Sequence, residues 1–171
     1  HYLPAFEQAI TEAKAEIDAI VNNPDAPTFE NTIAALDEAG SRLNDVASIF
    51  YNLMEADTND QMQAVAEKVS PMMTEYSMYV SLNEPLFARV KAVHESAEGL
   101  EQDQARLLEK TWKSFVRGGA NLGAEDKETY SKLSEQLSLL TLQYGKNVLA
   151  ATNAFTMNIT DEADLEGLPA F

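Results

Sequence analysis

The sequence predicts an all-α fold, an irregular bundle of about six mostly antiparallel helices. Apolar residues recur at steps of three and four along nearly the whole chain, which is the spacing of one face of a helix. Glycine and proline are scarce, with seven and six among 171 residues. Apolar residues make up 45% of the chain, which is enough to bury a core in a domain of this length.

The first two expected helices have the clearest apolar stripes. One stripe runs from Phe6 to Ile20, and its helix should end at residues 22–24, because proline at the last position cannot continue a helix. A second, long helix should start after Thr28, whose hydroxyl can cap free backbone N–H groups. Gly40 lies in its stripe, where it either permits a close helix crossing or is a tolerated defect. The stripe comprises Phe29, Ile33, Leu36, Gly40, Leu43, Ala47, Phe50 and Met54.

Four more helices are expected. The third follows a turn and cap at residues 57–60 and carries Pro71, where we expect a kink. Asn83 is expected to cap the fourth helix. The fifth covers about 102–117 and the sixth about 124–154. One apolar stripe follows the sixth helix, formed by Tyr130, Leu133, Leu137, Leu140, Tyr144, Val148 and Ala151.

The last part of the chain changes character. Residues 155–160 alternate apolar and polar side chains with period two, which predicts a short strand-like segment near the C-terminus. A lone strand is not stable, because its backbone groups need a partner. Residues 161–168 are expected to form a short helical turn. We therefore interpret residues 1–171 as a single helical domain that is a fragment of a larger protein.

The net charge of −16 argues against one class of partner. Residues 1–105 hold 19 acidic and 5 basic residues, whereas residues 106–171 hold 9 and 7. Such an acidic chain disfavours nucleic acid, because phosphates are bound by Lys and Arg. No apolar stretch is long enough to cross a membrane. We therefore expect neither of these two classes of partner, nucleic acid or membrane. The chain has no cysteine, which excludes disulfides and thiolate sites.

Titratable residues do not gather into a recognisable catalytic site. Histidine occurs only at His1 and His94, and there is no glycine-rich phosphate loop. The segment from His94 to Glu98 resembles the zinc motif His-Glu-x-x-His, but its fifth position is Glu and Gly99 follows at once. We favour an exposed histidine near a helix end, with a metal site on His94 and Glu98 as the weaker alternative. We assign no catalytic, cofactor-binding or metal-ligating residue to this chain.

Four basic residues lie along one side of the expected fifth helix, at steps of four, three and four. We interpret them as an ordinary polar face opposite the apolar side of that helix, because charged runs are usually solvated. The alternative is a docking stripe for acidic groups. The four residues, called the basic stripe below, are Arg106, Lys110, Lys113 and Arg117.

Five short stretches of the sequence form a recognisable series. They are residues 2–6 (YLPAF), 27–33 (PTFENTI), 82–90 (LNEPLFARV), 115–122 (FVRGGANL) and 153–155 (NAF). Their order and spacing resemble the N-terminal region of the peptidyl-dipeptidase branch of the thimet oligopeptidase family of zinc metallopeptidases. Tyr76 and Gly123 depart from the family pattern, which has His at the first position and a Ser or Thr cap at the second.

The resemblance implies a mainly helical zinc peptidase of two lobes around a deep channel. Such enzymes cut short peptides, and this branch removes dipeptides from the C-terminus. The resemblance places zinc on a His-Glu-x-x-His helix and a later Glu, in a C-terminal part that this chain does not include. The chain would then not be an enzyme by itself. Its implied partners are the catalytic part of the same protein and short peptide substrates, and its implied compartment is the cytoplasm.

We therefore expect the chain to form part of the wall of a substrate channel whose width admits only short peptides. The alternative is a stand-alone helical module that binds a partner protein through a groove or through the basic stripe. The two differ in what they leave uncovered. A fragment should expose an apolar patch and an unpaired segment at 155–160, whereas a complete module should close its own core.

Overall fold

The computed structural model describes residues 1–167, in which six α-helices of 13 to 31 residues make up most of the chain. The elements are α1 (Tyr2–Val21), the π-helix η1 (Phe29–Ala34), α2 (Ala35–Glu38), α3 (Ser41–Ala56), α4 (Asp60–Ser81), α5 (Glu84–Ser96), α6 (Gln102–Arg117), α7 (Ala124–Ala154) and the 3₁₀ turn η2 (Glu162–Leu165). The predicted all-α class is confirmed, and so are the helices expected at 102–117 and 124–154.

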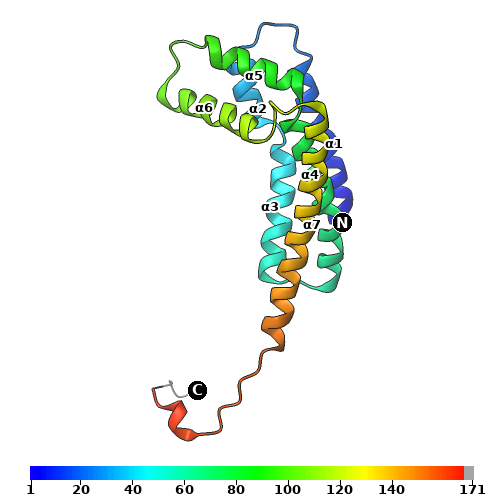
Figure 1. The fold of residues 1–171 in the computed structure, drawn as a ribbon, viewed down its shortest axis with the longest axis vertical. Coiled ribbons are helices and arrows are strands. Elements are labelled where there is room, and N and C mark those ends of the chain that lie inside the picture. The colour runs from blue at the N-terminus through cyan, green and yellow to red at the C-terminus, as the bar shows by residue number, and fades with distance from the viewer. Residues whose placement is uncertain (168–171) are drawn as a thin grey trace.

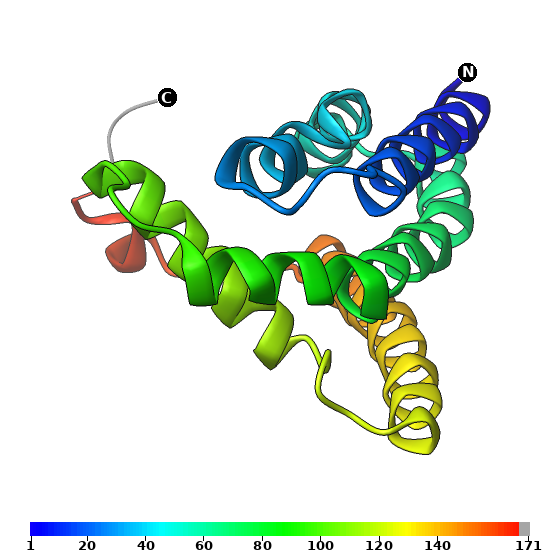
Figure 2. The ribbon, with the colours of Figure 1, turned by 90° about the horizontal axis from the view of Figure 1, so that it is seen from above.

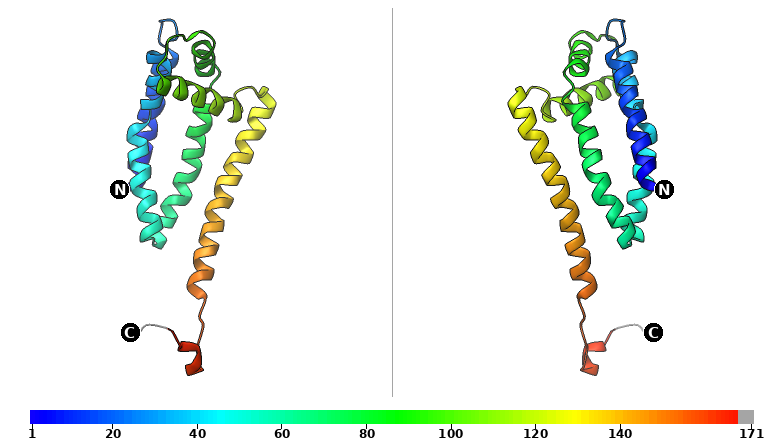
Figure 3. Two further views of the ribbon diagram at one scale, coloured as in Figure 1. Left: turned by 90° about the vertical axis from the view of Figure 1, so that its left-hand side faces the viewer. Right: turned by 90° about the vertical axis from the view of Figure 1, so that its right-hand side faces the viewer.

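Four long helices run along the long axis of the molecule in alternating directions (Figure 1). α1 and α4 run one way, and α3 and α7 run the other. α4 lies between the pair formed by α1 and α3 and the outer helix α7 (Figure 3). α5 and α6 form a helical hairpin across one end of this arrangement (Figure 2).

Two buried clusters hold the helices together, and α1 belongs to both. The upper core lies at the α5–α6 end and contains Ile17, Ile20, Phe29, Ile33, Leu86, Val90, Val93, Leu108, Phe115 and Ala120. The lower core lies between α1, α3 and α4 and contains Phe6, Ala9, Ile10, Ala13, Leu43, Phe50, Ala66 and Val69. The apolar stripe predicted from Phe6 to Ile20 is therefore the side of α1 that both cores share.

Polar contacts join α1 to α4 beside these cores. Lys14 pairs with Glu75 at 2.7 Å. The hydroxyl of Tyr79 donates a hydrogen bond to the carboxylate of Asp18. This bond, together with partial burial, raises the pKa of Tyr79 to about 12, because the hydrogen bond favours the protonated phenol.

Three predicted helix caps are confirmed at the side-chain level. The hydroxyl of Thr28 accepts a hydrogen bond from the N–H of Asn31 at 3.1 Å, and the side chain of Asn31 accepts one in return from the N–H of Thr28. The side chains of Asn59 and Asn83 each accept a bond from the N–H three residues later, at 3.0 Å in both cases. Caps of this kind satisfy the free N–H groups at a helix start. α4 continues through Pro71 to Ser81.

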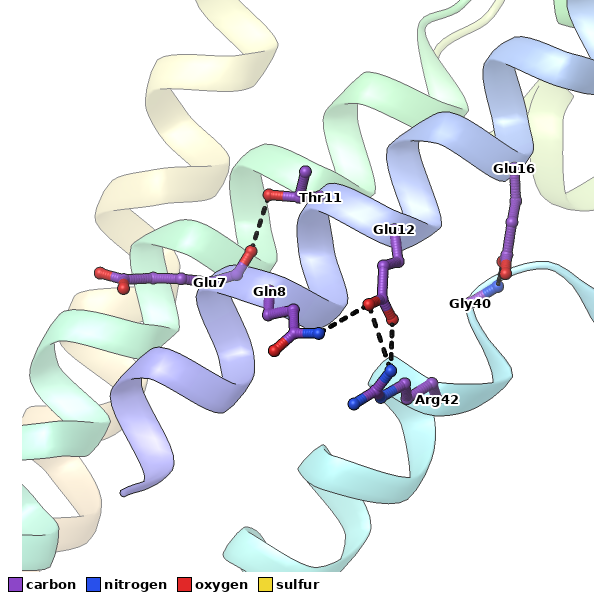
Figure 4. Close-up of polar contacts among 7 residues, drawn as sticks. All are labelled: Glu7, Gln8, Thr11, Glu12, Glu16, Gly40 and Arg42. Atoms are coloured by element: carbon purple, nitrogen blue, oxygen red, sulfur yellow. Dashed lines mark hydrogen bonds and ion pairs between the residues drawn. The ribbon is translucent and has the colours of Figure 1, made fainter.

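The single helix predicted over residues 29–54 is wrong at Gly40. This glycine has a left-handed φ of +77° and separates α2 from α3. Its N–H donates to the Glu16 carboxylate at 2.7 Å, and Arg42 at the start of α3 pairs with Glu12 at 3.0 Å (Figure 4). The predicted helix also begins with the π-helix η1 instead of a regular α-helix. The break allows the first half to pack in the upper core while α3 packs in the lower core.

The strand predicted at residues 155–160 is also wrong. The segment leaves α7 as an exposed irregular chain, and it has no ladder partner within residues 1–167. Period-two alternation does not make a strand by itself, since a strand is stabilised by hydrogen bonds to a neighbour. The helical turn expected over 161–168 is confirmed at Glu162–Leu165, while Leu168 lies outside the described residues.

Replacing two glycines by alanine tests the break at Gly40. A Cβ at Gly40 would lie 3.0 Å from the Tyr76 hydroxyl, and the left-handed φ adds strain, so Gly40→Ala should lower the free energy of unfolding by about 1–2 kcal/mol. Gly145 lies inside α7 with nothing within 4 Å of a Cβ, so Gly145→Ala should raise it by about 0.5–1 kcal/mol. Urea denaturation measures both changes. The same sign at the two positions would contradict the assigned backbone.

Candidate functional site

The recognisable stretches 27–33 and 82–90 meet at a polar cluster above the upper core. Stretch 27–33 starts η1, and stretch 82–90 starts α5. Arg89 connects them and is only 9% exposed. Its guanidinium donates to the carbonyl oxygens of Asn23 and Asp25, at 3.0 and 3.2 Å, and to the side-chain oxygen of Asn31 at 3.1 Å. The cluster therefore fixes the loop after α1 to the face of α5.

Asn31 is the centre of this cluster. Its side-chain oxygen accepts from the N–H of Thr28 and from the hydroxyl of Thr32, each at 2.8 Å, in addition to Arg89. Its amide nitrogen donates to the carbonyl oxygen of Ala26 at 2.9 Å. A buried arginine is stabilised here by carbonyl and amide oxygens, since no carboxylate pairs with it in the described part of the chain. Such a dense arrangement of partners holds one backbone geometry, which suits an architectural role.

A third stretch, residues 115–122, ends α6 and turns the chain toward α7. Gly118 leaves no space for a side chain, because a Cβ would lie 2.9 Å from the Ser114 carbonyl oxygen and 3.2 Å from Cβ of Ser81. Gly119 has a left-handed φ of +93°, which glycine adopts readily. The glycine pair therefore lets the α6–α7 turn pack closely against the end of α4. All three stretches lie at junctions between helices.

Arg89, the buried residue that joins two of these stretches, was not among the candidate residues predicted from the sequence. The position offered one signal, because Arg89 follows Leu86 by three residues and precedes Val90 and Val93 on the same helical face. A charged residue beside a buried apolar face is usually solvated, and only the folded loop 22–28 explains its burial.

The two residues of the weaker metal hypothesis lie in different segments. His94 lies in the last turn of α5, whereas Glu98 follows the end of that helix. The Nε2 atom of His94 contacts the Glu109 carboxylate at 3.1 Å, and its ring stacks on Trp112 with centroids 4.7 Å apart. Hydrogen bonds from Lys113 and then from His94 lower the pKa of Glu109. Within residues 1–167 there is no group of three or more His, Asp or Glu side chains able to hold a metal ion.

The basic stripe is exposed along α6, on the side opposite the buried Leu108 and Phe115. Lys113 pairs with Glu109 one turn away, at 2.8 Å. This placement agrees with the interpretation as a solvated polar face. None of the helices in the described residues is both long and apolar enough to cross a membrane.

The outer helix α7 carries the largest feature that the cores do not explain. It packs on α4 mainly through small and polar side chains, with Ser138 bonded to Ser70 at 2.5 Å and Lys146 paired with Glu67. The predicted apolar stripe lies on its other side and is exposed, with Leu137 66% and Leu140 67% accessible. We call five exposed residues of this stripe the outer face of α7: Leu133, Leu137, Leu140, Tyr144 and Val148.

A groove of about 710 Å³ lies next to this face, between α3, α4 and α7. Tyr51 and Met54 line it from α3, and Leu137, Leu142 and Leu149 line it from α7. The groove and the outer face of α7 thus form one apolar surface along the side of the bundle.

Replacing Arg89 tests the polar cluster. Arg89→Met keeps much of the side-chain volume but leaves partly buried carbonyl oxygens without their donor, so the free energy of unfolding should fall by about 1–3 kcal/mol. Lys91→Met is the matched control, because Lys91 is exposed on the same helix and pairs with Glu95 only at 3.8 Å. It should change stability by less than about 0.5 kcal/mol. Equal effects in chemical denaturation would show that the cluster does not stabilise the fold.

Comparison with known proteins confirms the resemblance seen in the sequence. The chain matches the family model Neurolysin/Thimet oligopeptidase, N-terminal domain, over residues 6–127. It is 38% identical over 170 residues to the dipeptidyl carboxypeptidases of Salmonella typhimurium and Escherichia coli, across 98% of this chain and 25% of each relative. It is 30% identical over 171 residues to oligopeptidase A of Haemophilus influenzae, across 99% of this chain and 25% of that relative. It therefore spans about a quarter of the length of these relatives. Because the family match covers well over half of the sequence, the chain belongs to the Neurolysin/Thimet oligopeptidase N-terminal domain family.

Proposed function

We propose that this chain is the non-catalytic N-terminal helical region of a zinc-dependent peptidyl-dipeptidase or oligopeptidase. The observation that carries the proposal is the match of nearly the whole chain to one quarter of dipeptidyl carboxypeptidases and oligopeptidases A. The zinc ligands and the catalytic groups would come from the other three quarters of such a protein. This chain would supply structure, which agrees with recognisable stretches that lie at helix junctions.

In the whole protein, the region would form part of one wall of the substrate channel. The logic is steric, because a narrow channel between rigid walls admits an unfolded short peptide and excludes a folded protein of any sequence. Two well-packed cores joined through α1 give the rigidity that such a wall requires. The proposed partners are the catalytic part of the same polypeptide and short peptides, and the proposed compartment is the cytoplasm. We also propose that residues 1–171 form a single helical domain of that protein.

The uncovered apolar surface favours this proposal over a stand-alone interaction module. A module closes its own core and presents a limited binding site, whereas here a helix of 31 residues exposes its apolar side along much of its length. The irregular segment after α7 is also unpaired within residues 1–167. Both features are expected of a region that packs against more protein.

Peptidase assays test the division of roles. The purified chain with one equivalent of Zn²⁺ is expected to leave a fluorogenic short peptide uncleaved. A chimera of the E. coli dipeptidyl carboxypeptidase, with its matched region replaced by this chain, should keep kcat/KM for short peptides within about tenfold of its parent, or about 1.4 kcal/mol of transition-state stabilisation. It should leave a folded protein intact.

Two results would oppose the proposal. Zinc-dependent cleavage that scales with the amount of pure chain would show that the chain is itself catalytic. Cleavage of the folded protein by the chimera, while the parent enzyme leaves it intact, would show that this region does not act as a restricting wall.

A further inference from the structure

The region around the outer face of α7 is nearly free of charge in an otherwise highly charged chain. Between residues 136 and 160 the only charged residue is Lys146, although charged residues make up 23% of the whole chain. Lys146 itself is paired with Glu67 of α4. A solvated helix normally carries charges on its outer side. An uncharged segment of this kind is typical of a buried surface, although these residues are exposed in the chain.

The polarity of α7 is reversed with respect to the helix on which it packs. Its serine-bearing side faces α4, where Ser138 bonds to Ser70, while Leu140 and Tyr144 point away and are 67% and 71% exposed. α7 is about 46 Å long, from 31 residues at 1.5 Å each. Figure 1 shows its C-terminal part continuing past the ends of α3 and α4. The apolar character continues into Phe155 and Met157, which are also exposed.

We infer that the outer face of α7 is the docking surface for the rest of the same polypeptide, which covers it with an apolar surface of its own. The inference rests on the proposed function, because the occupant is the part that corresponds to the other three quarters of the relatives. A covalently attached partner has a high effective concentration, so modest apolar contacts suffice to hold it in place.

The charge of the chain disfavours the other occupants. A second copy would bring two chains of −16 together, and that repulsion opposes self-association. An anionic membrane surface attracts helices whose polar side is rich in Lys and Arg, and α7 has only Lys127, Lys132 and Lys146, each of which pairs with a glutamate. A partner that is apolar at the contact and already tethered meets neither difficulty.

Cysteine labelling tests the inference independently of activity, because the chain has no cysteine of its own. Leu140→Cys places a thiol on the outer face, and Ala150→Cys places one on the exposed flank of the same helix. Each variant is treated with a maleimide, both in the 171-residue chain and in the E. coli chimera, and labelling at that site is followed by mass spectrometry. We expect Cys labelling at position 140 to be at least tenfold slower in the chimera than in the chain alone. Labelling at position 150 should keep a similar rate in both.

The outcomes separate this inference from the proposed function. Protection at position 140 in a chimera without peptidase activity would support the docking surface and count against the proposed function. Fast labelling at position 140 in a folded chimera, whether active or inactive, would overturn the docking surface. Protection in the chain alone that grows with chain concentration would also overturn it, because a second copy would then be the occupant.

Discussion

The whole fold depends on the apolar side of α1, which two separate cores share. Phe6 and Ile10 belong to the core with α3 and α4, whereas Ile17 and Ile20 belong to the core with η1, α5 and α6. A single helix 20 residues long thus fixes the position of one cluster relative to the other. The break at Gly40 follows from this constraint, because the segment packed beside α1 must contribute to both clusters in turn.

The recognisable sequence stretches stabilise the points where helices change direction. Arg89 and Asn31 hold the loop between α1 and η1, and Gly118 with Gly119 permits the close turn from α6 toward α7. Buried polar groups and left-handed glycines tolerate few replacements, since each has a specific partner or conformation. Specific stretches of sequence can therefore be required for structural reasons alone.

Local signals in the sequence were sufficient for most of the helices. Asn83 marks the start of α5, and the glycines at 118 and 119 mark the end of α6, by short-range chemistry, so these bounds could be predicted. The break at Gly40 could not, because it depends on Glu16 and Tyr76, which are distant in sequence. Period-two alternation at 155–160 predicted a strand wrongly, since pairing needs a neighbour that the sequence pattern does not reveal.

The apolar surface shows a second limit of sequence patterns. Periodicity identified the stripe of α7 correctly as one side of a helix, but it could not tell whether another part of this chain covers that side. The burial of Arg89 was missed for the same reason, because a loop far away in sequence encloses it. What covers a surface is a tertiary property, whereas the spacing of side chains is a local one.

Stability in the chain should therefore be concentrated around α1, with α7 held mainly by α4. Native-state hydrogen exchange followed by mass spectrometry tests this most directly, because each helix reports its own opening free energy. The account predicts that amides in the middle of α1 exchange only through global unfolding, while those of residues 145–154 exchange much faster. Protection of that end of α7 equal to that of α1 would contradict it, because α7 would then belong to the cooperative core of the isolated chain.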